Sequence, residues 1–371
     1  MNLSPQKLRL SILCAVLAWS LSALLGPPCK GPACLALEDG RTGILMSNHQ
    51  SRSGLCCRGH QIHQALDDQP GPSPASARLQ SRLNALMTGR AGDVIISDPR
   101  TGEITAAWNL ESGLRDAYPP GSTAKIVESA AALEEGAVSP QDQVWCRRVP
   151  PIVGEEYRCV HPPSRSGFTL PLALANSCNY YFVALSLQLT SETLSHWYSV
   201  FGFGQSTAAN GTPGGHVTVG PDLRRKALAA LGEAGIVATP AQVLQAYSAV
   251  ARRGEFRILW STREQRKDRV PSRRIELRSR TWGTLIDGLV GCVQFGTCQK
   301  AAVAGVRVAG KTGTATALDG SGATHAWFAG FAPAENPEIA IVVFLDRGTG
   351  AHSAAPLAGA ILREYFVARN Q

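Results

Sequence analysis

The 371-residue sequence contains no uninterrupted apolar run that reaches the ~20 residues a comfortable membrane-spanning helix needs. The nearest candidate extends from Leu10 to Leu25, is broken by three serines, and follows Lys7 and Arg9. A short apolar run behind positive charges is typical of an export signal. We therefore expect residues 1–36 to be a signal peptide or a membrane anchor. The protein would then be exported to the periplasm or another extracytoplasmic space, where anchoring to the inner membrane is the alternative to release.

Recognisable metal and haem motifs are also missing. Cys56 and Cys57 precede His60 and His63, but no second ligand pair follows at zinc-finger spacing, and the haem-attachment motif Cys-x-x-Cys-His is absent. We therefore predict no metal and no cofactor. Residues 37–76 show no sustained hydrophobic period and include Pro-Gly-Pro-Ser-Pro at 70–74, which predicts a flexible linker.

Cysteine is abundant for an exported chain, with ten in all and seven beyond residue 36. An odd number leaves at least one thiol free, and Cys178 is our candidate. Cys146 with Cys159, and Cys292 with Cys298, are local pairs in loop-like sequence. In an oxidising compartment both pairs are plausible disulfides.

The formal net charge is +8, and much of it lies within residues 263–280, which contain eight basic and three acidic residues. Such a stretch resembles a nucleic-acid-binding arm. An exported protein meets no nucleic acid, so we expect none as a partner. Weak attraction to anionic lipid or to a wall polymer is a milder possibility.

Periodicity in the remaining sequence predicts an α+β fold. Residues 77–87 match an amphipathic helix, and Val94 to Trp108 alternates around an Asp-Pro-Arg-Thr-Gly turn, as in a hairpin. Strands are expected at 326–332 and 339–345, before a terminal helix at 355–369. Further helices are expected at 170–189, 241–251 and 282–290. Strands at both ends of the domain with helices between them predict a mainly antiparallel sheet packed with helices on both faces.

The turn Tyr118-Pro119-Pro120-Gly121 delivers Ser122 to the start of an apolar helix that we expect to run to about Glu135. Lys125 follows one helical turn later on the same face. A serine hydroxyl is a weak nucleophile that needs an adjacent base, and a partly buried lysine can serve as that base. Ser-x-x-Lys alone is weak evidence, because most matches are capped surface helices.

Two further motifs strengthen this interpretation. Ser177-Cys178-Asn179 begins 55 residues after Ser122, and Lys311-Thr312-Gly313-Thr314 begins 134 residues after Ser177. Ser-x-x-Lys, Ser-x-Asn and Lys-Thr-Gly in this order are typical of serine acyltransferases. The chain therefore resembles the transpeptidase domain of penicillin-binding proteins over roughly residues 80–371, and we expect this domain to span residues 77–371. The resemblance extends to Phe-Gly-Phe-Gly at 201–204 and to Ala-Thr-Pro at 238–240, which is similar to a helix start of the family.

The resemblance implies a role for each motif. Ser122 would attack the carbonyl of a terminal D-alanyl-D-alanine or of a β-lactam, with Lys125 as base. Ser177 would relay the proton to the leaving amine, and Asn179 would hold Lys125 and the substrate amide. Lys311 would supply positive charge.

In the third motif, Thr312 and Thr314 would offer hydroxyls to the substrate carboxylate, and Gly313 would lie between them at the binding site. The backbone N–H groups of Ser122 and Thr314 would form an oxyanion hole.

The resemblance thus implies a D,D-transpeptidase, or a D,D-carboxypeptidase, that acts on peptidoglycan stem peptides and is inhibited by β-lactam antibiotics such as penicillin. A β-lactam or muropeptide sensor is one alternative, although only nine residues precede the apolar run, too few for a cytoplasmic output domain. A class D-like β-lactamase is the other alternative, but the second motif of that group is Ser-x-Val, where this chain has Asn179.

Within about forty residues after Asn179 the single acid is Glu192, in a setting unlike that of a deacylating base. No glycosyltransferase or large pedestal domain fits in the ~80 residues ahead of the fold, and the sequence identifies no protein partner.

Overall fold

The computed structural model of the protein describes residues 74–164, 166–207, 214–261 and 273–369. The predicted signal or anchor segment lies outside these residues, as do all but the last three residues of the predicted linker and most of the basic stretch 263–280. Among the helices that are described, none combines the length and the apolar character needed to cross a membrane.

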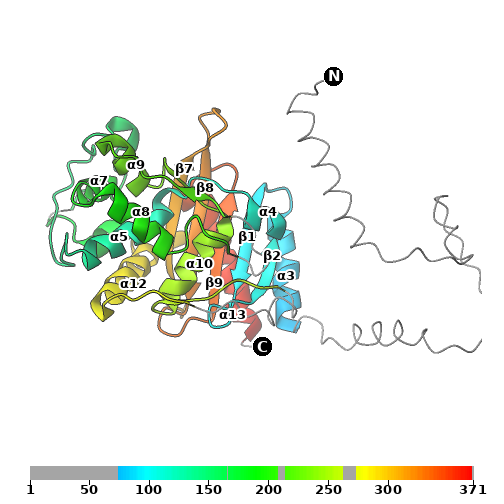
Figure 1. Cartoon of the computed structure of the whole chain (residues 1–371). Helices are drawn as coiled ribbons and strands as arrows, with labels where there is room; N and C mark the ends of the chain where they lie inside the picture. Colours follow the sequence, from blue (N-terminus) through cyan, green and yellow to red (C-terminus); the bar gives the residue numbers. More distant parts are fainter. Residues whose placement is uncertain (1–73, 165, 208–213, 262–272, 370–371) are drawn as a thin grey trace, which may run out of the picture. The chain divides into compact units, whose positions relative to one another are not determined.

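A five-stranded sheet organises the described chain (Figure 1). Its spatial order is β2-β1-β9-β8-β7, and every neighbouring pair is antiparallel. The strands are β1 (Gly92–Ser97), β2 (Ile104–Trp108), β7 (Ala309–Thr316), β8 (Thr324–Ala332) and β9 (Ile339–Leu345). The predicted antiparallel sheet, the hairpin and the closing strand pair are therefore confirmed.

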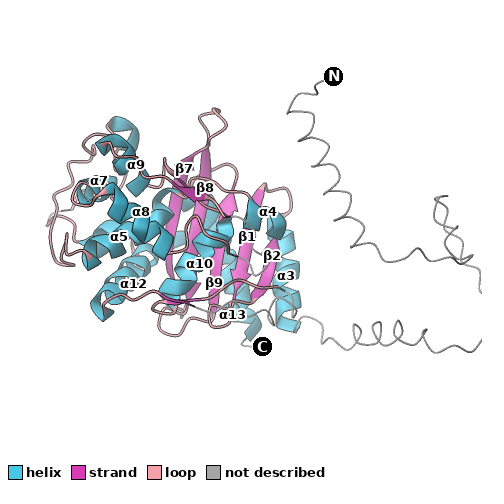
Figure 2. Cartoon of the chain, viewed as in Figure 1, coloured by secondary structure: helices cyan, strands magenta, loops and turns pink. Residues whose placement is uncertain are grey.

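Helices cover both faces of this sheet (Figure 2). Along β1, Val94 and Ile96 belong to the core shared with α3 (Pro74–Met87) and α13 (Ala355–Arg369). Ile95, between them, belongs to the larger core on the opposite face. Because side chains alternate along a strand, a sheet buried on both faces shows continuous apolar runs, and every residue of β9 is buried.

The larger core is built mainly by helices between β2 and β7. The predicted helix over 170–189 is in fact two helices separated at residues 176–178, and the Ser122 helix begins with a 3₁₀ turn. The helical elements are α4 (Leu110–Arg115), η1 (Gly121–Ala124), α5 (Lys125–Glu134), η2 (Glu155–Tyr157), α6 (Leu170–Ala175), α7 (Asn179–Ser186), α8 (Ser191–Val200), α9 (Leu223–Ala230), α10 (Pro240–Ala251), α12 (Ser279–Gln294), η3 (Gln299–Ala301) and η4 (Gly350–Ala354). Two small sheets pair β3 (His216–Val217) with β4 (Ile236–Val237), and β5 (Glu255–Phe256) with β6 (Arg273–Arg274).

Helix α10 lies at the centre of the larger core, and all its residues are buried. Its start is fixed by a capping box, in which the Thr239 hydroxyl accepts from the Gln242 N–H at 3.1 Å and the Gln242 side chain accepts from the Thr239 N–H at 3.0 Å. Pro240 in the first turn suits a helix start because its missing N–H has no intrahelical partner there. The helix start predicted from the Ala-Thr-Pro motif is therefore confirmed.

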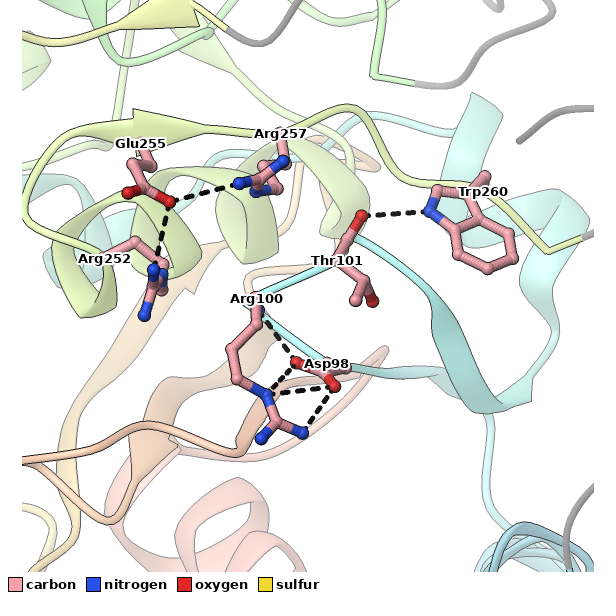
Figure 3. Close-up of polar contacts among 7 residues, drawn as sticks. All are labelled: Asp98, Arg100, Thr101, Arg252, Glu255, Arg257 and Trp260. Carbon is pink, nitrogen blue, oxygen red and sulfur yellow. Dashed lines mark hydrogen bonds and ion pairs between the residues drawn. The ribbon is translucent and has the colours of Figure 1, made fainter. Parts of the chain in front are cut away.

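The β1–β2 turn is tied to the segment around β5 by the polar contacts of Figure 3. The Asp98 carboxylate accepts from the Arg100 guanidinium within the turn, and the Trp260 indole N–H donates to the Thr101 carbonyl at 3.0 Å. The same close-up draws Glu255 between Arg252 and Arg257. The hydrogen bond from Trp260 to Thr101 holds the hairpin turn against the segment that follows β5.

The described arginines of the basic stretch also make structural contacts. Arg273 lies over the Phe256 ring at 4.0 Å. Arg278 is the N-cap residue of α12, and its backbone N–H and its Nε each donate to the Glu134 carboxylate at 3.1 Å. Thr281, in the first turn of α12, also donates to Glu134. The last residue of α5 therefore caps α12, whose own N-cap side chain makes no capping hydrogen bond.

Replacing this external cap should destabilise the fold. We expect Glu134→Ala to lower the free energy of unfolding by about 1–2 kcal/mol, because the Arg278 N–H and the Thr281 hydroxyl at the start of α12 lose their acceptor and the helix loses a favourable negative charge. Denaturant unfolding followed by circular dichroism measures the change. Glu276→Ala is the matched control, since its carboxylate forms an exposed ion pair with Arg274. Equal stability of the two variants would contradict the capping role.

Candidate active site

The turn ahead of Ser122 is held from three sides. The Trp327 indole on β8 donates to the Pro119 carbonyl at 3.0 Å, and the Thr123 hydroxyl donates to the Pro120 carbonyl at 2.7 Å. Gly121 takes a left-handed φ of 53° and donates its N–H to the Gly232 carbonyl at 2.9 Å. Ser122 is half-buried between the buried Gly121 and Thr123, so its position is fixed while part of it stays accessible.

Lys125, the first residue of α5, is completely buried. Its Nζ donates to the Asn179 Oδ1 at 2.6 Å, to the Ser177 carbonyl at 3.1 Å and to the Ser177 Oγ at 3.3 Å. Burial is the main cause that lowers the pKa of Lys125 to about 8. With such a pKa about a tenth of the amines are neutral at pH 7, and a neutral amine can accept a proton.

The second motif lies in the break between α6 and α7. Ser177 has a φ of 55°, in the left-handed region that non-glycine residues rarely adopt. This conformation lets both its carbonyl and its hydroxyl reach Lys125. The Asn179 amide is fixed at its other end, because Nδ2 donates to the Tyr157 carbonyl at 3.0 Å.

The third motif forms β7, on the edge of the sheet. Lys311 is fully buried and donates from Nζ to the Thr312 carbonyl at 3.0 Å. Burial, and then the charge of Lys125, place the pKa of Lys311 well below its ordinary value. This electrostatic coupling joins the third motif to the first, while hydrogen bonds join the first to the second.

The two threonines of the third motif already have partners. The Thr312 hydroxyl lies 2.6 Å from that of Thr297, a residue between α12 and η3 that the sequence analysis missed. The Thr314 hydroxyl accepts from the Gly350 N–H at 3.0 Å. Both hydroxyls are therefore oriented by the protein.

Gly313 permits a close approach between β7 and the 3₁₀ turn that carries Ser122. A Cβ on Gly313 would lie 2.8 Å from the Pro120 carbonyl oxygen and 3.0 Å from the Thr123 Cγ2. The absence of a side chain thus sets the spacing between the first and third motifs. The contact between Gly313 and substrate stays a prediction.

Two acids near these motifs, one buried and one half-buried, were missed from the sequence. Glu128, one turn after Lys125, is fully buried, and burial raises its pKa well above the ordinary value. The Glu233 carboxylate accepts from the Thr316 N–H at the end of β7, at 3.1 Å, and burial raises its pKa as well. The i, i+3 spacing from Lys125 was the one signal available for Glu128. Glu192, by contrast, is exposed in the first turn of α8.

The cysteines correct one prediction and confirm two. Cys292 and Cys298 form a disulfide, as predicted, and Cys178 is a free thiol, as predicted. Cys146 and Cys159 are also free, so the predicted bond between them is wrong. The intervening loop instead brings both sulfurs, His161 and Cys178 together, with their ligand atoms within 4.8 Å of one another.

This cluster could hold a metal ion, where the sequence analysis predicted none. Its ligands have the spacing Cys-x₁₂-Cys-x-His, which is unlike that of a zinc finger, and the fourth ligand is the middle residue of the Ser-x-Asn motif. No sequence motif indicates the cluster, because the sequence places Cys178 only within the Ser-x-Asn motif.

The family model "Penicillin binding protein transpeptidase domain" matches residues 92–363. The chain belongs to this family. The peptidoglycan D,D-transpeptidase PbpA of Mycolicibacterium smegmatis is 30% identical over 282 residues, which cover 68% of this chain and 56% of the relative. The peptidoglycan D,D-transpeptidase MrdA of Acinetobacter baumannii is 26% identical over 384 residues, which cover 85% of this chain and 55% of that relative. The chain spans about half the length of the curated relatives it matches.

Solved structures share the fold of this penicillin-binding protein transpeptidase domain. Pseudomonas aeruginosa PBP2, solved in complex with WCK 5153, superposes with a TM-score of 0.65 at 25% identity and covers 77% of this chain and 76% of its own. The transpeptidase domain of Burkholderia pseudomallei penicillin-binding protein 3 superposes with a TM-score of 0.63 at 24% identity. The match covers 80% of this chain and 92% of that structure. The predicted fold and the predicted family are therefore confirmed.

The close approach at Gly313 predicts the effect of a single methyl group. Gly313→Ala should lower the free energy of unfolding by about 1–3 kcal/mol, because the new Cβ overpacks the contact between β7 and the Ser122 turn. Urea unfolding measures this change in the free energy of unfolding. Gly283→Ala is the matched control in α12, where a Cβ meets nothing within 4 Å. There the added Cβ should be neutral or stabilising by up to about 1 kcal/mol. A Gly313 variant as stable as the control would refute the packing argument.

Proposed function

We propose that this protein is a serine-type D,D-transpeptidase that acts on D-alanyl-D-alanine stem peptides of peptidoglycan. The observation that carries the proposal is the position of Lys125, which follows Ser122 by one helical turn and is bound to both Ser177 and Asn179. The printed names of the relatives, peptidoglycan D,D-transpeptidases, support it. β-Lactams, which share the reactive acyl group, would act as inhibitors.

In the proposed reaction, Ser122 Oγ attacks the carbonyl carbon of the penultimate D-alanine while Lys125 takes the hydroxyl proton. The C–N bond then breaks, and Ser177 passes a proton to the leaving amine of the terminal D-alanine. An amine of a neighbouring stem peptide attacks the acyl-serine to form the cross-link, or water attacks to complete a carboxypeptidase cycle.

Substrate binding would rest on the remaining motif residues. Asn179 would orient the peptide amide, and Lys311 would attract the terminal carboxylate through its field inside a buried site. Thr312 and Thr314 would donate hydroxyls to the same carboxylate, beside Gly313. The N–H groups of Ser122 and Thr314 would stabilise the developing oxyanion, which the short distance between the Ser122 turn and β7 favours.

We further propose that residues 1–36 direct export or anchor the chain, that residues 37–76 are a linker, and that 77–371 is the catalytic domain. A periplasmic or other extracytoplasmic location follows from the substrate. We expect no nucleic-acid partner. No feature among the residues that the structure describes favours a β-lactam sensor. A class D-like β-lactamase is disfavoured because its carbamylated lysine requires a dry apolar pocket, whereas Lys125 lies against the Asn179 amide.

The nucleophile can be tested with labelled penicillin and the intact mass of the chain. The label should attach to Ser122 and be absent from Ser122→Ala, while Lys125→Ala and Lys311→Ala should each slow acylation by about 100-fold or more. Ser139→Ala, at an exposed serine outside the three motifs, should react like the wild-type protein. Undiminished labelling of Ser122→Ala would refute the assignment.

The lifetime of the same adduct separates a transpeptidase from a β-lactamase. With no deacylating base identified, the penicilloyl adduct should persist until a suitable amine is added. Loss of the adduct within seconds and repeated turnover of penicillin would overturn the proposal in favour of a β-lactamase.

The pKa of Lys125 predicts how acylation depends on pH. A base must be unprotonated, so the acylation rate should rise about tenfold per pH unit below a midpoint of about 8 and level off above it. Stopped-flow measurement with a chromogenic β-lactam gives the profile, and circular dichroism at each pH controls for unfolding. A rate that stays flat between about pH 6 and about pH 9 would exclude Lys125 as the titrating base.

A further inference from the structure

We propose that Cys146, Cys159, His161 and Cys178 form a closed tetrahedral zinc site that fixes the second catalytic motif. This goes beyond the proposed function, because neither the acyl-transfer chemistry nor the three motifs require a metal. The site would be structural, with four protein ligands and no open position for substrate.

The distances within this cluster, hereafter the Cys₃His cluster, suit a tetrahedral ion. The Cys159 and Cys178 sulfurs lie 3.9 Å apart, the Cys146 sulfur lies 3.7 Å from the His161 Nε2, and all four ligand atoms are within 4.8 Å of one another. Zinc–sulfur bonds of about 2.3 Å at tetrahedral angles place sulfurs about 3.8 Å apart. The ligand atoms therefore already lie near the corners of such a polyhedron.

The imidazole of His161 is oriented as a metal ligand. Its Nδ1 lies 2.8 Å from the Pro162 carbonyl oxygen, which can only accept, so Nδ1 carries the proton. Nε2 then holds a free lone pair, and Nε2 is the nitrogen that faces Cys146. Histidine ligands of zinc commonly donate their other N–H to a backbone carbonyl in this way.

Two of the three sulfurs accept hydrogen bonds from backbone N–H groups. The Arg148 N–H donates to the Cys146 sulfur and the Tyr180 N–H donates to the Cys159 sulfur, both at 3.3 Å. Cys159, His161 and Cys178 are buried, and Cys146 is half-buried. Three soft thiolates with one imidazole select zinc over the hard cations magnesium and calcium.

A disulfide accounts for the cluster less well than a metal. A bond between any two of the sulfurs requires them to close to about 2.05 Å, and it would leave the third thiol and the oriented imidazole without a role. A zinc ion uses all four groups at the separations that they already have. Oxidation of a metal-free cluster is nevertheless the competing outcome that the test must detect.

The ion would connect the loop from Cys146 to His161 to the catalytic turn. Cys178 stands between Ser177 and Asn179, and Tyr157, whose carbonyl holds the Asn179 amide, lies inside the loop two residues before Cys159. Asn179 in turn accepts from Lys125. Zinc would therefore act indirectly, by fixing the loop and the turn that hold Asn179, the residue that accepts a hydrogen bond from Lys125.

The test uses the full-length protein, purified with reductant and with zinc present, and then dialysed. We expect one zinc per chain by elemental analysis, and cobalt substitution should give sulfur-to-cobalt charge-transfer bands with the strong visible bands of tetrahedral cobalt. Cys146→Ser and His161→Ala should each weaken zinc affinity by at least about tenfold in a chelator competition. Because Cys146 is half-buried, its variant should fold, and circular dichroism verifies this for both.

Two controls address other zinc ligands in the chain. His196→Ala removes an exposed histidine, and the double change Cys56→Ser with Cys57→Ser removes the other thiols that lie near histidines in the sequence. Both control proteins should keep the full zinc content. Zinc lost from the Cys56/Cys57 variant but kept by Cys146→Ser and His161→Ala would place the metal elsewhere and overturn the proposal. So would the absence of zinc together with a Cys146–Cys159 or Cys159–Cys178 disulfide in unreduced peptide maps.

Acylation by labelled penicillin is read separately. Removal of zinc should slow acylation of the wild-type protein, and zinc added back should restore it. Metal content requires no activity, so zinc bound in a protein that penicillin does not label would contradict the proposed function and leave the zinc site standing. Labelling at an unchanged rate after zinc removal would overturn the positioning role.

Discussion

The burial of the Lys125 ammonium is the constraint on which the active site depends. Removing a charged amine from water is costly unless its donors are satisfied, and here they are satisfied by Asn179 and by two oxygens of Ser177. The second motif is therefore a structural requirement of the first. The same burial lowers the pKa of Lys125 toward neutrality, so part of the amine that this arrangement holds is uncharged near pH 7.

A second buried lysine shapes the electrostatics of the site. Lys311 and Lys125 disfavour each other's charge, and no acid that could neutralise them by a direct ion pair is described beside either one. Glu128 is buried without a hydrogen-bond partner in the described chain, and burial favours its neutral form. The site is thus poised for an incoming anion, and the carboxylate of a stem peptide or a β-lactam would relieve the repulsion between the two amines.

The sequence predicted the parts of the fold whose signals are local. Alternating apolar residues gave the hairpin and β8–β9, and the Ala-Thr-Pro motif gave the start of α10. The break at Ser177 could not be predicted in the same way, because a left-handed serine has no compositional signal and the apolar pattern continues through it. Thr297 and the Cys₃His cluster were missed because their partners lie on other segments, so that only tertiary structure brings them together.

The left-handed Ser177 shows how the separate parts depend on one another. Such a conformation costs about 1–3 kcal/mol and persists only where its surroundings impose it. Here the end of α6 accepts the Ser177 and Cys178 N–H groups, and the buried side chain of Cys178 anchors the turn from the other side. Strain in this turn is the cost of bringing two oxygens of one residue to a single buried amine. The packing around Cys178 therefore helps to fix the turn from which Ser177 and Asn179 reach Lys125.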